Sequence, residues 1–155
     1  MASSDLVVSP VATKADLKEF IRLPRRLYAG HKGWVAPLNV ERQEAFSPKK
    51  NPLFKHAEVQ FFLARRAGRV VGRISAQVDR AYLEQYADST GQFGCLVAED
   101  DPAIFAALFA VAEVWLKARG MVRVTGPFSL SINEEVGLLV DGFDSRPVLM
   151  VPYDP

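Results

Sequence analysis

The chain has 155 residues, of which 49% are hydrophobic and 24% charged, and its net charge is +1. These values are typical of one folded domain and not of a disordered segment or a basic nucleic-acid-binding protein. The single cysteine, Cys95, excludes an internal disulfide and a cysteine metal cluster. His31 and His56 lack the spacing of metal ligands, so we expect no metal, and we expect His56 to be structural.

The sequence shows no pattern typical of a targeting signal. Residues 1–11 lack a basic segment followed by a long apolar one, so we expect no signal peptide. No apolar run reaches the roughly 20 residues of a membrane span. We therefore expect a cytoplasmic protein without a membrane span.

The first third of the chain predicts a strand, a helix and an irregular segment. Residues 5–12 fit a strand, and residues 14–23 fit a helix that Thr13 caps and Pro24 breaks or kinks. The arginines at the end of this helix are expected to bind its terminal carbonyls and water, in preference to an anion: Arg22, Arg25 and Arg26.

Residues 28–54 are irregular, with a short helix expected at 38–46. Long irregular segments often bind ligands, so Trp34 is either part of a pocket or, the interpretation we favour, a lid on the core.

Residues 58–79 predict a β-hairpin, because apolar side chains alternate on both sides of a turn at Ala67 and Gly68. Gly72 interrupts the second strand and indicates a bulge or a close backbone approach. The arginines near the turn fit a solvated tip, with a phosphate site as the minor alternative: Arg65, Arg66, Arg69 and Arg73. Residues 80–88 should form a short helix or loop, in which Tyr82 and Tyr86 anchor the connection or, less favoured, supply an acid.

A strand–helix–strand unit follows. Residues 92–98 are apolar, Asp101 is a suitable N-cap for a helix over residues 102–119, and residues 121–126 are again apolar and β-branched. Such a unit forms two parallel strands joined by a crossover helix. The helix is apolar on more than one side, so we expect it to be buried there.

The last part predicts one more helix and strand. Ser129 or Ser131 could cap a helix over residues 134–140, and residues 147–152 could form a strand. The complete order of elements predicts an α/β protein with a mixed sheet and helices on both faces.

Three segments give this order a family resemblance: 61–78 (FFLARRAGRVVGRISAQV), 112–126 (AEVWLKARGMVRVTG) and 133–143 (NEEVGLLVDGF). They resemble the central hairpin, the third helix with the fifth strand, and the terminal helix and turn of the acyl-CoA N-acyltransferase (GNAT) family. The resemblance implies a GNAT-like fold, with a mixed and mostly antiparallel sheet, for a single domain over residues 1–155. It also implies transfer of an acyl group from acetyl-CoA, another acyl-CoA or a carrier thioester to an amine.

More narrowly, segments 48–66 and 126–143 resemble a bacterial group of GNAT-like proteins that are roughly twice this length. Some members are associated with N-acylation of long-chain sphingoid bases. This resemblance implies that the chain is the N-terminal half of such a protein, truncated at its C-terminus, and that the amine is lipid-like. It also implies pairing with a second GNAT-like half or a homodimer, and leaves room for peripheral membrane contact.

The chain departs from the family pattern at residues 98–104 (AEDDPAI). GNAT enzymes usually carry a glycine-rich turn here, whose N–H groups bind the CoA pyrophosphate at a helix N-terminus. This chain has no glycine in the turn and three carboxylates, which satisfy the helix dipole themselves and repel phosphate. CoA would then bind elsewhere, or the domain would not bind it.

In the family, two parallel strands separate and hold the thioester between them, which here would be 92–97 and 122–125. The resemblance then implies catalytic roles for Asn133, as hydrogen-bond donor, and for Glu134 or Glu135, as base. The alternative for this run is a helix cap with acids in the first turn. The residues implied to hold the thioester are Phe93, Cys95, Val97, Glu99, Phe128, Ser129 and Ser131. Cys95 itself is expected to be a buried, inert thiol. A non-catalytic module that binds a ligand or pairs with a second module is the alternative function.

Overall fold

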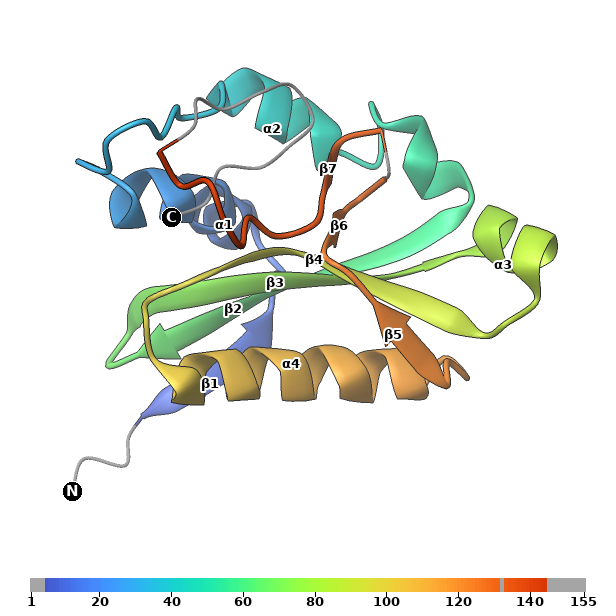
Figure 1. The fold of residues 1–155 in the computed structure, drawn as a ribbon. Helices are drawn as coiled ribbons and strands as arrows, with labels where there is room; N and C mark the ends of the chain where they lie inside the picture. Colours follow the sequence, from blue (N-terminus) through green and yellow to red (C-terminus); the bar gives the residue numbers. More distant parts are fainter. Residues whose placement is uncertain (1–4, 132, 145–155) are drawn as a thin grey trace.

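The computed structural model describes residues 5–131 and 133–144 (Figure 1). Its main sheet has five strands in the order β1-β2-β3-β4-β5. The pairs β1–β2, β2–β3 and β3–β4 are antiparallel, and the pair β4–β5 is parallel. The strands are β1 (Leu6–Pro10), β2 (Ala57–Arg66), β3 (Arg69–Asp79), β4 (Thr90–Ala98) and β5 (Arg123–Thr125). The prediction of a mixed, mostly antiparallel sheet is confirmed.

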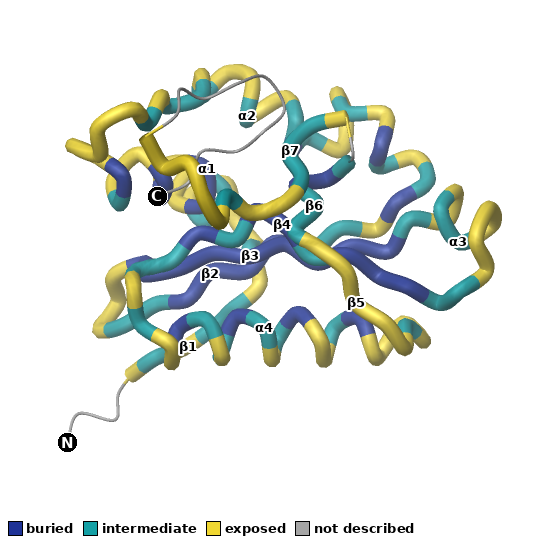
Figure 2. The backbone as a smooth tube through the Cα atoms, viewed as in Figure 1, coloured by how far each residue is buried: buried dark blue, intermediate teal, exposed yellow. Residues whose placement is uncertain are grey.

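Helices cover both faces of this sheet. Figure 1 shows α4 (Pro102–Lys117) below it, with α1 (Lys14–Leu27) and α2 (Asn39–Ala45) above. A 3₁₀ turn, η1 (Pro52–Lys55), precedes β2, and α3 (Arg80–Tyr86) follows β3. Each face has its own apolar core, and the central strands are the most continuously buried part of the chain (Figure 2). Trp34 packs against the upper core and contacts the Tyr28 ring, so it is the expected lid.

The β2–β3 hairpin turns at Ala67 and Gly68, which both have positive φ. The register shifts by one residue between Ala64 and Arg65, so Val71 forms a bulge beside Gly72. A Cβ at Gly72 would lie 2.8 Å from the Ile104 side chain of α4. The predicted bulge is therefore confirmed, while the atoms that approach Gly72 closely belong to side chains and not to another backbone.

Of the two effects predicted for Pro24, a break or a kink, the break is wrong. Helix α1 continues through this residue to Leu27, and the Tyr28 N–H donates to the Pro24 carbonyl. Proline at position 24 cannot donate to the Phe20 carbonyl one turn earlier. The Arg73 side chain on β3 does so instead, with 2.6 Å between Nη1 and the Phe20 oxygen.

The arginines near the hairpin turn are paired and do not form a simple solvated tip. Arg65 binds Asp16, Arg66 binds Asp101 and Arg69 binds Glu99. Arg73, which we expected at the same tip, is buried beneath α1. At the end of α1, the Arg25 and Arg26 side chains donate to the carbonyls of Pro37 and Val70, outside their own helix.

The predicted helix over residues 134–140 is absent from the described part of the chain. The chain instead forms a small antiparallel ladder of β6 (Phe128–Ser129) and β7 (Glu135–Val136), which lies over the upper face of the main sheet (Figure 1). Leu130 and Gly137 have positive φ, which a continuous helix does not allow. The strand predicted at 147–152 falls outside the described residues.

Candidate functional site

Strands β4 and β5 separate only beyond the end of β5, which is paired with β4 along all of Arg123–Thr125. They pair only from Thr90 to Gln92 on β4, and β4 continues to Ala98 without a β5 partner. A bulge with positive φ at Cys95 adds local twist to the free part of the strand. The sheet therefore opens into a fork beyond Gln92.

The first part of this fork is filled by β6. A Cβ placed on Gly94 would lie 1.7 Å from the Phe128 carbonyl oxygen, so the two backbones touch and only glycine fits. The Cys95 N–H donates to the Ser129 hydroxyl at 3.2 Å, a side-chain bond where an intact sheet would have a ladder bond. A hollow lies on each side of this β4–β6 contact along β4, one beside Gln92 and one beside Leu96–Ala98.

The hollow beside Gln92 is a polar pocket of about 430 Å³ beneath β6 and η1. We use "polar pocket" for the hollow whose lining includes His56, Gln77, Asp79, Gln92, Phe128, Leu130, Ser131 and Asn133. Most of these side chains are neutral, and Asp79 is the only carboxylate that the described residues contribute to the lining.

The floor of the polar pocket belongs to a stripe of polar side chains along the central strand β3. Ser75 and Gln77 are 0% and 2% exposed, and Arg73 and Asp79 extend the same alternating row. Burial of a polar group is unfavourable unless it is hydrogen-bonded. Polar residues at these central positions therefore indicate a site and not a simple core.

The orientation of the Gln77 amide is fixed by its partner. Nε2 lies 2.8 Å from the Leu130 carbonyl oxygen, which can only accept, so Oε1 must point the other way. Gln77 and Gln92 face each other across β3 and β4. Both Oε1 atoms are buried, and neither has a hydrogen-bond partner among the described residues. The pocket thus offers acceptors that lack donors.

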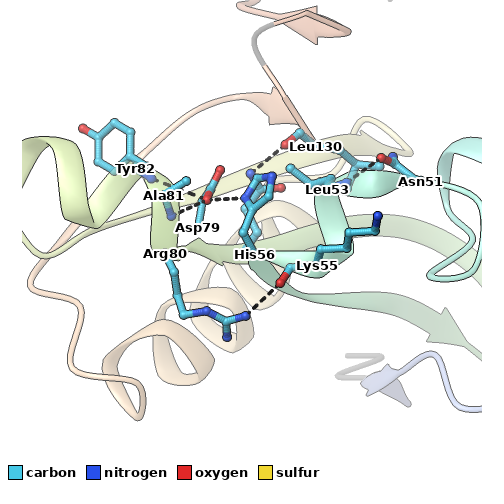
Figure 3. Close-up of polar contacts among 10 residues, drawn as sticks. Asn51, Leu53, Lys55, His56, Asp79, Arg80, Ala81, Tyr82 and Leu130 are labelled. Atoms are coloured by element: carbon cyan, nitrogen blue, oxygen red, sulfur yellow. Dashed lines mark hydrogen bonds and ion pairs between the residues drawn. The ribbon is translucent and has the colours of Figure 1, made fainter.

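His56 lines the same pocket and points toward Asp79 (Figure 3). Its Nδ1 lies 2.7 Å from Asp79 Oδ1, and its side chain is 44% exposed. Asp79 also caps α3 by accepting from the N–H groups of Ala81 and Tyr82, which holds its carboxylate in place. A neutral imidazole that donates from Nδ1 keeps its lone pair on Nε2. This arrangement, a base oriented by a fixed carboxylate, can accept a proton from a bound molecule.

The unpaired end of β4 faces an apolar groove of about 660 Å³. We use "apolar groove" for the hollow between the end of β4 and the end of α1, lined by Leu27, Tyr28, His31, Leu96, Val97, Ala98, Glu99, Asp100, Phe105 and Leu138. Its acidic rim adjoins the first turn of α4.

The N-terminus of α4 does not fit a pyrophosphate. Asp101 occupies it by accepting from the Ala103 N–H at 2.9 Å, and Pro102 has no N–H. Arg66 binds the Asp101 carboxylate at 2.8 Å, and this bond holds the pKa of Asp101 below its usual value. Glu99 is bound by Arg69 in the same way. Arg66 and Arg69 thus pair with carboxylates of the protein itself, so this turn does not offer them to a phosphate.

The residues predicted to hold a thioester are distributed over the fork. Val97 and Glu99 line the apolar groove, and Phe128 and Ser131 line the polar pocket. Cys95 and Ser129 are buried at the β4–β6 contact, where burial raises the pKa of the Cys95 thiol. Phe93 packs against Phe109 of α4, within the core of the opposite face.

The three residues predicted to be catalytic do not lie together in one site either. Asn133 lines the polar pocket. Glu135 is bound by Arg42, which attaches β7 to α2. Glu134 lies outside the lining of the polar pocket, and partial burial raises the pKa of its carboxyl group. Tyr82 borders the pocket, but its hydroxyl is bonded to Asp88, as an anchoring role requires.

Sequence reasoning missed the pairing of His56 with Asp79 and the role of the two glutamines. A signal was present in β3, where Arg73, Ser75, Gln77 and Asp79 alternate with apolar residues. Such an alternation normally means one buried and one solvated face. On a central strand covered by helices on both faces, it means a buried polar row.

The chain has the fold of the GNAT acetyltransferases. Its structure is similar to a tandem GNAT protein from the clavulanic acid biosynthesis pathway, with a TM-score of 0.56 and 20% identity over 74% of this chain and 34% of that one. It is also similar to AAC(6′)-Iy in complex with the bisubstrate analogue CoA-S-monomethyl-acetylneamine, with a TM-score of 0.56 and 13% identity over 81% of each chain. No protein-family model matches the sequence.

Two curated proteins are similar over 99% of the chain. One is the bacterial ceramide synthase of Caulobacter vibrioides, 55% identical over 154 residues, and the other is Protein YghO of Escherichia coli, 47% identical over 153 residues. The chain covers 40% and 39% of their lengths. It therefore spans about two fifths of each relative, which agrees with the expectation that its relatives are much longer.

Two negative findings apply to residues 5–131 and 133–144. No helix in these ranges is both long enough and apolar enough to cross a membrane. Within the same ranges, no three His, Cys, Asp or Glu side chains come together in a way that could hold a metal ion.

Proposed function

We propose that the chain takes part in the transfer of an acyl group from a thioester to an amine. The fork in the sheet supports this proposal, because a polar pocket lies beside Gln92 at the base of the fork and an apolar groove borders the unpaired end of β4. The groove suits an acyl or pantetheine chain, and the pocket suits a polar acceptor. The fold supports acyl transfer in general.

The thioester can come from acyl-CoA or from a carrier protein. CoA would supply an activated acyl carbonyl, and Val97 with neighbouring apolar groove residues would contact its chain. The acidic turn before α4 does not fit the pyrophosphate of CoA, so the proposal relies on the pantetheine end, which both donors share. We retain Asn133 as a donor to the substrate and Glu134 as one candidate base.

A long-chain, lipid-like amine is the finer form of the proposal. It is supported by the name of the Caulobacter vibrioides relative, bacterial ceramide synthase, since a ceramide is an N-acylated long-chain amine. The tandem GNAT neighbour supports pairing of this unit with a second one. Activity of the whole relative would then need both parts.

Calorimetric titration tests the proposal. The chain is titrated with acetyl-CoA, a long-chain acyl-CoA and the matching S-acyl-pantetheine, and release of free thiol is then followed with a long-chain amine present. Saturable binding of a thioester together with amine-dependent thiol release is the expected result. Absence of thioester binding to the chain and to a longer protein that contains it would refute the proposal and favour a non-catalytic module.

A further inference from the structure

We propose that the polar pocket is the acceptor subsite, in which Gln77 holds a primary amine and His56 takes its proton. Asp79 is a positioning residue for His56 in this scheme. The inference rests on the proposed function and adds to it the atoms that recognise the acceptor. It assigns the proton transfer to His56 in place of Glu134 or Glu135.

The chemistry of the lining selects an amine over an anion. Among the described residues of the lining, Asp79 is the only carboxylate and there is no lysine or arginine. The Oε1 atoms of Gln77 and Gln92 are buried acceptors without donors in the described structure. An alkylammonium group or a free amine supplies N–H donors to these atoms, whereas a phosphate or carboxylate would bring further acceptors to them.

The walls of the pocket suit the carbon chain of such an amine. Pro52, Leu53, Phe128 and Leu130 add apolar surface around the polar floor. A volume of about 430 Å³ is within the range of small-molecule sites, roughly 300–1,000 Å³. The amine end therefore binds at Gln77, and the chain follows the wall.

His56 is placed to remove a proton at this point. Nδ1 is committed to Asp79 at 2.7 Å, and Nε2 has no hydrogen-bond partner among the described residues. The fixed carboxylate stabilises the imidazolium that forms, because Asp79 is held by the α3 N–H groups. Glu135, by contrast, is bound by Arg42, and neither Glu134 nor Glu135 lines the pocket.

Acyl transfer to the amine begins with the loss of a proton. An alkylammonium group loses one proton to Nε2 of His56, and the free amine attacks the thioester carbonyl carbon. A C–N bond forms and the C–S bond breaks. The nitrogen then loses its second proton, and the leaving thiolate gains one. Amide and thiol are the products, and His56 returns its proton to water.

The first test measures amine binding without any thioester. Chemical shifts of the Gln77 and Gln92 side-chain amides are followed by NMR while n-octylamine is added, with n-octanol as the matched neutral probe. Saturable shifts with octylamine, weakened about tenfold or more by Gln77→Met and unchanged by Glu84→Gln on the exposed side of α3, are expected. Equal shifts with both probes, or none, would overturn the assignment of the pocket.

The second test measures turnover in the chain or the longer protein that shows thiol release. His56→Gln should lower kcat about 100-fold or more, as loss of a general base does. Asp79→Asn preserves the α3 cap and should lower kcat with little change in KM for the amine. Imidazole added to His56→Ala should restore part of the rate, which a purely structural histidine would not allow. Full activity of His56→Gln, with loss only in Glu134→Gln, would overturn the role of His56.

The two tests separate the inference from the proposed function. Amine binding at Gln77 without turnover in any protein would refute the proposed function and preserve the amine site. Turnover that survives Gln77→Met and His56→Gln would preserve the proposed function and refute the inference.

Discussion

The Arg73 side chain donates to the Phe20 carbonyl because Pro24 cannot. A buried carbonyl without a donor destabilises a protein by about 1–3 kcal/mol. The guanidinium also lies over the Phe20 ring, 4.8 Å from its centre, so one side chain satisfies the carbonyl and packs on the ring.

This relationship predicts coupling between positions 24 and 73. Arg73→Met should lower the free energy of unfolding by about 2–4 kcal/mol, from the lost bond and the lost ring contact. Pro24→Ala should be markedly less destabilising, or stabilising, in the Arg73→Met background, because alanine at this position supplies the missing N–H. Urea unfolding of the four proteins in the cycle measures the coupling. Strictly additive effects would show that the Phe20 carbonyl has another donor.

The contact between Gly94 and Phe128 predicts a second stability effect. Gly94→Ala should destabilise the fold by about 1–3 kcal/mol or displace β6, because its Cβ would meet backbone atoms. Gly72→Ala is the matched comparison, since its Cβ would meet the side chains of Ile104 and Leu108, which can shift. Urea midpoints and the Ser129 amide shift report on the two variants. A larger loss for Gly72→Ala would contradict this reasoning.

Acid should destabilise the protein through Asp16 and Asp101. Hydrogen bonds from Thr13 lower the pKa of Asp16, and the bond from Arg66 lowers that of Asp101. Both carboxylates therefore stabilise the fold above their unfolded pKa of about 3.9, and this contribution is lost as pH falls through their lower folded values. Asp101→Asn keeps a capping residue and should weaken the dependence of the urea midpoint on pH between about 5 and 2. An unchanged pH profile would show that Asp101 does not contribute.

Glu134 should change the pH dependence of stability in the opposite direction. Burial raises its pKa, so the folded state binds its proton more tightly than the unfolded chain does. Stability from this group is present at low pH and decreases as pH rises from the unfolded pKa to the higher folded value. Glu134→Gln should therefore be slightly more stable than the parent protein at about pH 7, with no gain at about pH 3. A loss of stability near neutral pH would show that the carboxylate has a favourable partner.

The acidic turn before α4 predicts how thioesters bind. S-acyl-pantetheine should bind within about tenfold of the matching acyl-CoA, a difference below about 1.4 kcal/mol, because no built site receives the pyrophosphate. Asp100→Asn should leave the affinity for S-acyl-pantetheine nearly unchanged and should not weaken that for acyl-CoA, because it removes a charge that repels phosphate. Calorimetry with the two ligands gives the ratio, and a hundredfold preference for acyl-CoA would reveal a pyrophosphate site elsewhere on the protein.

Local patterns in the sequence were enough to predict most of the sheet. Alternation around Ala67 and Gly68 indicated the hairpin, and Asp101 with Pro102 indicated the start of α4. The helix expected at 134–140 failed because long-range contacts, the pairing of β7 with β6 and the bond of Glu135 to Arg42, outweigh local helix signals.

The pairing of His56 with Asp79 depends on register, which the sequence does not state. His56 precedes Ala57, and Ala57 pairs with Asp79 only because Val71 adds one residue to the hairpin. Without that bulge Ala57 would face Val78, and Asp79 would move out of position. The fork was predictable from the family resemblance, whereas the polar pocket required the actual register.

The row of buried polar side chains on β3 also lowers the stability of this fold. Valine or leucine at positions 75 and 77 would remove two buried atoms, Ser75 Oγ and Gln77 Oε1, that lack hydrogen-bond partners among the described residues, and such a removal commonly raises stability by more than the lost bond from Gln77 to the Leu130 carbonyl lowers it. A selection for thermal resistance alone should therefore favour the changes that remove the acceptors of Gln77. Libraries screened for heat tolerance alone would then yield a more stable but inactive protein. Positions at which a screen for heat tolerance and a screen for activity select different residues would mark the site.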